Sequence, residues 1–211
     1  MITAVTIGVG RAYREMAELA AASVQRWTGL EPVVIRNTRG IHPAKYKLKL
    51  LEQFDGPVFY FDADTRMVGP WPELLGYGSS PAFRASAHEP AAAVTQDCEH
   101  HKLDQRVYFY SGAWIANREH HGEAFRLADE ICHAEGYVTQ FAYEQTALNV
   151  SMQRLRIPIE PLPPARHVIC TRGRQYAIPP DAALLHVAGR GLQIENRKIF
   201  EREIIRRERC D

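Results

Sequence analysis

The stretch PVFYFDADT, residues 57–65, decides the fold that we expect for this chain. Its four β-branched or aromatic residues, Val58 to Phe61, favour a buried strand, and Asp62 and Asp64 follow that strand directly. Two carboxylates so close together repel each other at neutral pH unless a cation or water compensates their charge. The stretch therefore predicts a strand that ends in a charged pair. The alternative is a solvated turn in which Asp64 caps a following helix.

The residues before this strand alternate between strand and helix patterns. Residues 4–10 and 31–37 read as strands, 13–27 has the spacing of an amphipathic helix, and 44–54 resembles a second helix. A strand–helix–strand–helix–strand order predicts a mainly parallel sheet with helices on its faces. Ligands bind beyond the carboxyl ends of the strands in such sheets, which is where the two carboxylates would lie.

The pattern after residue 65 is less regular. We expect a short helix over 70–75, strands over 81–89, 106–117 and 183–189, helices over 119–135 and 141–154, and a helical tail over 194–209. Residues 90–105 show no clear period and are expected to form a loop, and 157–168 contain too many prolines for a helix or strand. The adjacent histidines at 100–101 and 120–121 are expected at the surface.

Composition limits the possible functions of the chain. Its 211 residues suffice for one domain with a sizeable core, and its net charge of +1 favours neither nucleic acid nor a membrane as partner. The N-terminus lacks the features of a signal peptide, and no run of about 18 apolar residues predicts a membrane span. The four cysteines form no Cys-x-x-Cys pair, so we expect no disulfide framework or zinc site and a cytoplasmic location.

The Asp62-x-Asp64 pair suits a divalent metal, because carboxylate oxygens are the ligands that Mg²⁺ and Mn²⁺ prefer. Three enzyme families place such a pair after a strand: haloacid-dehalogenase-like phosphatases, sugar nucleotidyltransferases and GT-A glycosyltransferases. The phosphatases carry it on the first strand, whereas here a strand–helix–strand–helix unit precedes it. The nucleotidyltransferases open with a Gly-rich basic loop, of which VGRAYRE, 9–15, is only a weak echo.

Five segments in order resemble the GT-A glycosyltransferases, in particular the retaining, family-8-like group related to glycogenin and bacterial galactosyltransferases. These segments are TIGVGRAY (6–13), YKLKLLEQFDGPVFYFDAD (46–64), YFYSGAWIAN (108–117), YEQTALNV (143–150) and LLHVAG (184–189). The chain departs from the family at Tyr110, which precedes Ser111 and stands where Asn is usual, and at Glu144, where Asp is usual. The Lys-Pro-Trp that often follows the last segment is replaced by a stretch that begins with Arg190.

The resemblance implies an α/β fold: a single GT-A-like, Rossmann-like domain over 1–211 with a mostly parallel central sheet and helices on both faces. Residues 1–64 would form the nucleotide-binding half, 65–190 the half that binds the donor sugar and the acceptor, and 191–211 a helical tail. It also implies a metal site at Asp62, Asp64 and His186. Because imidazole nitrogen is a softer donor than oxygen, Mn²⁺ is favoured over Mg²⁺ there.

The resemblance further implies a UDP-sugar as donor and an acceptor that the sequence does not identify. The residues that would bind the donor are Tyr13, Lys47, Asp62, Ser111, Gly112, Gly189 and Arg190. Tyr13 would stack on the base, and Lys47 would contact phosphate or sugar hydroxyls. Gln145 and Glu144 would be catalytic, stabilising the sugar during front-face attack with retention. The open alternatives are a phosphatase that uses Asp62 and Asp64, and a non-catalytic nucleotide-sugar-binding domain.

Overall fold

The computed structural model describes residues 1–89, 91–140, 143–170, 178–187, 198, 201–203 and 205–207. The helices are α1 (Arg11–Thr28), α2 (Pro43–Lys47), α3 (Leu50–Gln53), α4 (Ala92–His101), α5 (Arg118–His133) and α6 (Tyr143–Arg154), with 3₁₀ helices at Pro72–Ser79 and Gln105–Val107. The strands are β1 (Thr3–Ile7), β2 (Val33–Ile35), β3 (Val58–Phe61), β4 (Thr65–Met67), β5 (Phe83–Ala87), β6 (Phe109–Ala116), β7 (Ile159–Pro161), β8 (His167–Cys170) and β9 (Leu184–Val187).

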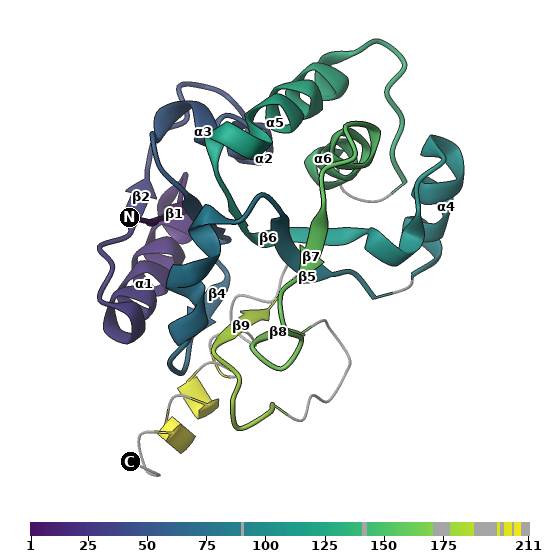
Figure 1. The fold of residues 1–211 in the computed structure, drawn as a ribbon. Coiled ribbons are helices and arrows are strands. Elements are labelled where there is room, and N and C mark those ends of the chain that lie inside the picture. Colours follow the sequence, from purple (N-terminus) through teal and green to yellow (C-terminus); the bar gives the residue numbers. More distant parts are fainter. Residues whose placement is uncertain are drawn as a thin grey trace.

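The larger sheet has the strand order β2-β1-β3-β6-β5-β7. The pairs β1–β2, β1–β3 and β5–β7 are parallel, whereas β6 is antiparallel to both of its neighbours. All strands of this sheet except β6 therefore point the same way, and helices pack on both faces (Figure 1). This is the mostly parallel α/β sheet that the sequence predicts.

The smaller sheet has the strand order β4-β9-β8 (Figure 1). Its first strand, β4, begins one residue after Asp64 and pairs antiparallel with β9, so that Thr65 lies opposite His186. β8 runs parallel to β9 on the other side. The sequence does not predict β4, because three residues are too few to show a strand pattern and the partner strand is distant in the chain.

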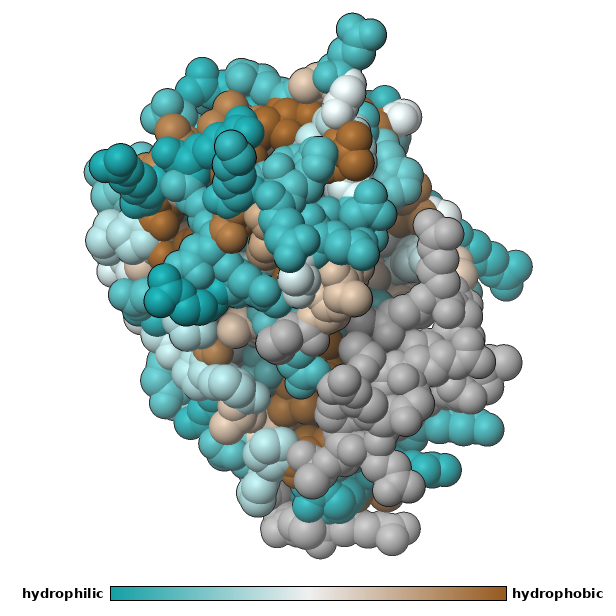
Figure 2. All heavy atoms as spheres, turned by 90° about the vertical axis from the view of Figure 1, so that its right-hand side faces the viewer, coloured by the Kyte–Doolittle hydropathy of each residue, from teal (hydrophilic) through white to brown (hydrophobic). Residues whose placement is uncertain are grey.

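The surface on the α4 side of the molecule is mainly hydrophilic, with smaller groups of hydrophobic atoms among the polar ones (Figure 2). Leu19, Leu75 and Val138 are among the large apolar side chains that are exposed in the described residues. Exposed apolar residues of this kind are normal on globular proteins. Among the described helices, none combines the length and the hydropathy needed to cross a membrane.

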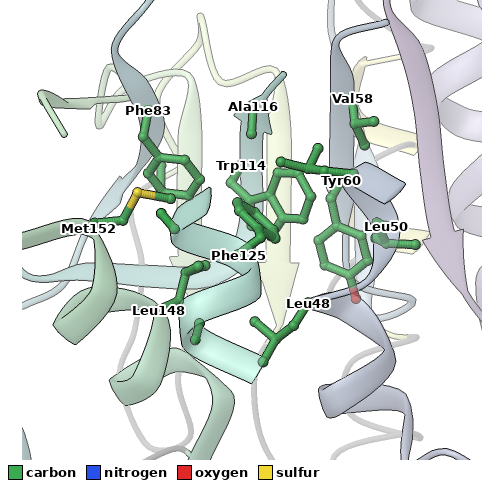
Figure 3. Close-up of a cluster of buried hydrophobic side chains, with 14 of the residues drawn as sticks. Leu48, Leu50, Val58, Tyr60, Phe83, Trp114, Ala116, Phe125, Leu148 and Met152 are labelled. Atoms are coloured by element: carbon green, nitrogen blue, oxygen red, sulfur yellow. The ribbon is translucent and has the colours of Figure 1, made fainter. Parts of the chain in front are cut away.

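The main core lies between the larger sheet and α5 and α6 (Figure 3). Side chains alternate along β3, so Tyr60 faces this core while Phe59 and Phe61 pack on the opposite face with α1. Trp114 on β6 stacks on Tyr60 at 5.2 Å between ring centroids and meets Phe125 of α5 at 4.9 Å. Each fully buried side chain of this size contributes about 1.5–3 kcal/mol, so this packing fixes the strand that carries the carboxylates.

The single helix expected over 44–54 is two short helices, α2 and α3. Lys49 between them has φ −96° and ψ 0°, and the N–H of Leu48 bonds back three residues along the chain in a tight turn. The break allows Leu48 and Leu50 to enter the core, and it leaves Lys47 at a buried helix end. Periodicity alone does not show this break, because both halves keep a helical pattern.

The prediction of a loop over 90–105 is wrong, because this region contains α4. Its buried face consists of Val94, Asp97 and Cys98. A carboxylate at one of the core positions hides the helical period of apolar residues on which the prediction relied. The short helix expected over 70–75 is a longer 3₁₀ helix.

The proline-rich region 157–168, expected to be irregular, contains β7 and the start of β8. Pro161 fits because β7 is the edge strand of the larger sheet, where a missing N–H is tolerated. Of the expected tail helix, residues 198, 201–203 and 205–207 are helical, and the rest of 194–209 lies outside the described residues.

The adjacent histidines are not all at the surface. His100 is exposed, as expected, but His121 is fully buried on α5. The N–H of Asn117, the residue before α5, donates to His121 Nδ1 at 3.0 Å, and the Asn117 side chain caps the helix by accepting from the N–H of His120. His121 is therefore part of the structural start of α5.

Candidate active site

Asp62, Asp64 and His186 converge beyond the carboxyl end of β3. Each offers one ligand atom, and these atoms all lie within 4.8 Å of one another. His186 Nε2 is 3.0 Å from Asp64 Oδ1 and 3.9 Å from Asp62 Oδ2. The backbone explains the convergence: the N–H of Asp62 donates to Gly112 O at 2.8 Å, and the β4–β9 pairing brings His186 opposite the residue after Asp64.

Charge interactions dominate this group. Burial disfavours the imidazolium form of His186, but Asp64 and then Asp62 outweigh that effect and raise its pKa. Burial also disfavours the ionised form of Asp64, but the neighbouring His186 outweighs burial and lowers the pKa of this carboxyl. For Asp62 burial is the stronger effect, and its pKa is raised. His186 and the two carboxylates therefore favour each other's charged forms, with Asp64 the closest partner of the imidazole. Two carboxylates and an imidazole also form a donor set that suits Mn²⁺ or Mg²⁺, which would replace the imidazolium proton.

Lys47 lies inside the site and has three partners. Its Nζ is 3.3 Å from Asp62 Oδ1, 3.1 Å from Glu144 Oε1 and 3.3 Å from the carbonyl oxygen of Ser111. It also lies 4.9 Å from the centre of the Tyr60 ring. Burial opposes its charge, but Asp62 and Glu144 outweigh burial and raise the pKa of Lys47. Since an ammonium has three protons, these acceptors occupy all of its donors.

The first turn of α6 carries Glu144 and Gln145. Glu144 Oε1 accepts hydrogen bonds from Lys47 and, at 3.2 Å, from Ser111 Oγ. Burial disfavours the ionised form, but Lys47 outweighs it, so the pKa of Glu144 is lowered and the group is a carboxylate. Gln145 Oε1 accepts from the N–H of Ser111 at 3.0 Å, and its buried Nε2 has no hydrogen-bond partner among the described residues. A contact between Gln145 and a sugar stays a prediction.

Gly112 lets β6 pass close to the candidate metal group. A Cβ atom at this position would overlap the imidazole of His186 and the ring of Tyr110. The Tyr110 hydroxyl lies 3.2 Å from His186 Nε2. The close approach that the sequence suggests for Gly112 is therefore an approach to a candidate ligand.

In sequence, the chain matches no protein-family model and no curated protein. In structure, it is similar to a glycosyltransferase involved in the glycosylation of the major capsid of PBCV-1, with a TM-score of 0.66 and 13% identity over 95% of this chain and 98% of that one. It is also similar to the bifunctional glycosyltransferase WbbM in its apo structure, with a TM-score of 0.64 and 12% identity over 98% of this chain and 51% of WbbM.

The fold is one that glycosyltransferases use. At these identities the similarity concerns the fold, and this chain spans about half the length of the WbbM chain. No observation favours the phosphatase alternative.

Within this glycosyltransferase fold, one of the predicted donor-binding residues stands apart from the carboxylates, and two lie outside the described residues. Tyr13 is on α1 with 52% of its surface exposed, and among the described residues no contact joins it to Asp62 or Asp64. Gly189 and Arg190 lie outside the described residues. The structure brings together Lys47, Asp62, Asp64, Ser111, Gly112, Glu144, Gln145 and His186.

His167 is a site residue that the sequence does not predict. Its buried ring lies nearly parallel to that of His186, at 18° and 6.0 Å between centroids, and its Nδ1 forms a hydrogen bond with the Ser86 hydroxyl. Burial lowers the pKa of His167 to about 3, and nearby His186 adds to the effect, so His167 is neutral. A register shift between Ala85 and Ser86 accompanies this contact. Only the pairing of β8 with β9 reveals His167.

Tyr60 is a second residue that was missed, and here the sequence holds a signal. Its hydroxyl donates a hydrogen bond to Asp62 Oδ1. Residues two apart along a strand share one face, so an aromatic hydroxyl two residues before Asp62 could have been recognised as its neighbour. Asp62 thus has both Tyr60 and Lys47 as partners.

Proposed function

We propose that this chain is a metal-dependent glycosyltransferase of the GT-A, family-8-like class, transferring a sugar from a nucleotide diphosphate sugar with retention of configuration. UDP is the proposed nucleotide. The observation that carries the proposal is the Asp62–Asp64–His186 group beyond β3 in a fold that glycosyltransferases use. Residues 1–64 would serve nucleotide binding, 65–190 the donor sugar and acceptor, and 191–211 a helical tail, in one domain.

Asp62, Asp64 and His186 are the proposed ligands of Mn²⁺ or Mg²⁺. When bound, such an ion offsets the negative charge that develops on the leaving diphosphate. Tyr13 is the proposed stacking partner of the base, and Arg190 that of a donor phosphate. Lys47 holds Asp62 in place by an ion pair, which supports a role in shaping the site more than one in binding phosphate directly.

Retention requires the acceptor oxygen to bond to the anomeric carbon on the face that the diphosphate leaves. In front-face transfer, the acceptor's proton passes to the departing phosphate oxygen as the anomeric C–O bond breaks. Glu144 is hydrogen-bonded to Lys47 and Ser111, which reduces its nucleophilicity but leaves its negative charge to stabilise the oxocarbenium-like sugar. Gln145, by holding the N–H of Ser111, would align β6 beside that sugar.

A cytoplasmic location is proposed from the cysteines. Cys98, Cys132 and Cys170 are buried free thiols. Burial raises the pKa of all three thiols, so they are weak nucleophiles and resist oxidation. Buried unpaired thiols of this kind are typical of proteins in reducing compartments.

The proposed function is tested by thermal unfolding with UDP in the presence of Mn²⁺ or EDTA. If metal and nucleotide bind together, UDP stabilises the fold far more with Mn²⁺, by about 2.7 kcal/mol at a concentration of 100 Kd. Equal shifts in both conditions would remove the metal from the proposal. A panel of nucleotide sugars, assayed for release of the nucleoside diphosphate, then identifies the donor.

A further inference from the structure

A polar cavity lies beside α4, and none of the residues of the candidate active site lines it. Its volume is about 470 Å³, and the described residues that line it are Gln96, Asp97, Glu99, His100, Val138 and Gln140. Four come from α4 and two from the segment that leads to α6. α4 stands at the right-hand side of the molecule in Figure 1, and the mainly hydrophilic face of Figure 2 is on this side.

One wall of the cavity is held rigidly by Asp97, which is 1% exposed. Its carboxylate accepts hydrogen bonds from the N–H of Gln140 at 2.6 Å, from Thr139 Oγ1 at 3.0 Å and from Thr146 Oγ1 at 2.8 Å. These bonds tie α4, the 138–140 segment and α6 together. A carboxylate that already accepts this many hydrogen bonds is held in one position and has few lone pairs left for a ligand.

A series of contacts connects the cavity wall with the candidate metal group. Thr146, which bonds to Asp97, follows Glu144 and Gln145 in the first turn of α6. Glu144 pairs with Lys47, and Lys47 pairs with Asp62. The first turn of α6 therefore links the cavity wall to the residues around the candidate metal group.

The other polar side chains of the lining are available for a ligand. Gln96, Glu99, His100 and Gln140 are exposed, and their side chains have no hydrogen bond or ion pair within the described part of the chain. Two amides, a carboxylate and an imidazole offer both donors and acceptors. Among the described lining residues there is no Lys or Arg, and Glu99 repels anions. The chemistry fits a neutral, hydroxyl-rich ligand and disfavours a diphosphate.

We propose that this cavity is a subsite for a neutral saccharide, which serves as the acceptor or as the part of a longer acceptor next to its reacting end. As an acceptor site, the cavity rests on the proposed glycosyltransferase function. Gln96 and Gln140 are the residues assigned to hydrogen-bond the sugar hydroxyls, from α4 and from the facing segment.

Saturation-transfer NMR on the full chain tests the subsite with neutral probes: methyl glycosides of glucose, galactose, mannose and rhamnose, and the disaccharides lactose, maltose and cellobiose. UDP binding with Mn²⁺ is measured in parallel by calorimetry. We expect at least one saccharide to bind to the wild type, and the Gln96→Ala/Gln140→Ala variant to bind it roughly tenfold more weakly with unchanged UDP affinity.

Two further variants make the test specific. Val138→Trp fills the cavity without removing a hydrogen bond; since Val138 is 42% exposed, the fold tolerates the change, and saccharide binding should weaken as well. Gln25→Ala removes an exposed glutamine on α1 and should change nothing. Thermal unfolding verifies that each variant is folded.

The outcomes separate this inference from the proposed function. If no probe binds, or if binding survives both cavity variants, the subsite is overturned, whatever UDP does. If saccharide binding depends on the cavity but UDP does not bind with Mn²⁺, the subsite stands as a saccharide site and the glycosyltransferase function fails.

Discussion

A fully buried histidine lies beyond each end of the β3–β6 strand pair of the larger sheet, and the pKa values of the two histidines are shifted in opposite directions. His186, on β9 of the smaller sheet, lies beyond the end where β3 leads to Asp62 and Asp64, and His121 lies at the opposite end, where the antiparallel strand β6 leads into α5. Burial lowers the pKa of His121 to about 4. His186 is buried just as completely, but Asp64 and Asp62 outweigh burial and raise its pKa.

Burial is the main cause that lowers the pKa of a histidine in this fold, as His121 and His167 show. The pKa of His186 is raised because two carboxylates lie beside it, and His186 and Lys47 in turn offset the charge of these carboxylates. The end of β3 beside Asp62, Asp64 and His186, here called the ionic edge, is thus a cluster of charged groups that depend on one another. The opposite end, beside His121, is here called the structural edge. Changes there should affect the stability of the fold and leave turnover unaffected.

The largest effect on the ionic edge is expected from Lys47→Met. Removing one partner of a buried ion pair costs about 3–5 kcal/mol, and we expect about 3 kcal/mol because the Asp62 side chain keeps 26% exposure. Urea unfolding measures the loss. The double variant Lys47→Met/Glu144→Gln should recover part of it, since one uncompensated carboxylate is then neutral. If the two substitutions destabilise additively, the Lys47–Glu144 interaction is not the cause.

Asp64→Asn should remove activity while keeping the fold. Loss of residues that merely orient metal ligands costs 10–100-fold, so losing a ligand should lower turnover by more than about 100-fold. The stabilisation by UDP that requires Mn²⁺ should disappear in the same variant. Asp55→Asn is the matched control, because it changes an exposed carboxylate that precedes β3 in the chain, whereas Asp64 follows it. Full activity in Asp64→Asn would exclude the metal site.

The role of His167 as a positioning residue is tested with Ser86→Ala/His167→Phe. Replacing both partners of a buried hydrogen bond by apolar groups is nearly neutral for stability. We still expect Mn²⁺ affinity to fall about tenfold, because a phenyl ring that makes no hydrogen bond to residue 86 no longer holds the stacked imidazole of His186 in one position. Electron paramagnetic resonance of Mn²⁺ measures the affinity, and turnover at saturating Mn²⁺ should recover. Unchanged affinity would make His167 purely structural.

At the structural edge, His121→Gln should change only the pH dependence of stability. The pKa of His121 is about 4 in the folded protein against 6.5 for the free group, so the unfolded chain binds more protons between these values. Its contribution to the free energy of unfolding therefore falls as the pH drops from 6.5 to 4, by up to about 1.4 kcal/mol per pH unit. His121→Gln should flatten the curve over this window, with turnover unchanged. If urea unfolding shows the same pH dependence of the free energy of unfolding for both proteins, this assignment is contradicted.

Much of the larger sheet could be predicted because its strands carry their signal locally. Val58 to Phe61 are β-branched or aromatic, and the first helix shows a clear amphipathic period. α4 was missed because Asp97 occupies a core position, where its partners come from other segments. β4 was missed because, in the part of the chain that the structure describes, it pairs only with the distant strand β9.

The candidate site was predictable to a different degree. Asp62 and Asp64 follow from the strand that precedes them, whereas His186 was associated with them only by resemblance to a family. Lys47 was expected near the donor. Its three ammonium protons instead face Asp62, Glu144 and the Ser111 carbonyl, which lie on three segments distant in the sequence. No spacing within the sequence encodes such contacts, because they arise from how the sheets pair.

The pairing of β4 with β9 has a consequence for the order in which the site is made. During synthesis the two carboxylates leave the ribosome early, together with Lys47, and the imidazole of His186 follows only with one of the last described strands. Contacts between such distant segments form late in folding. A nascent chain that stops before β9 would hold its acidic pair without the third ligand. Tight metal binding would therefore report that translation has passed β9 and that the small sheet has closed.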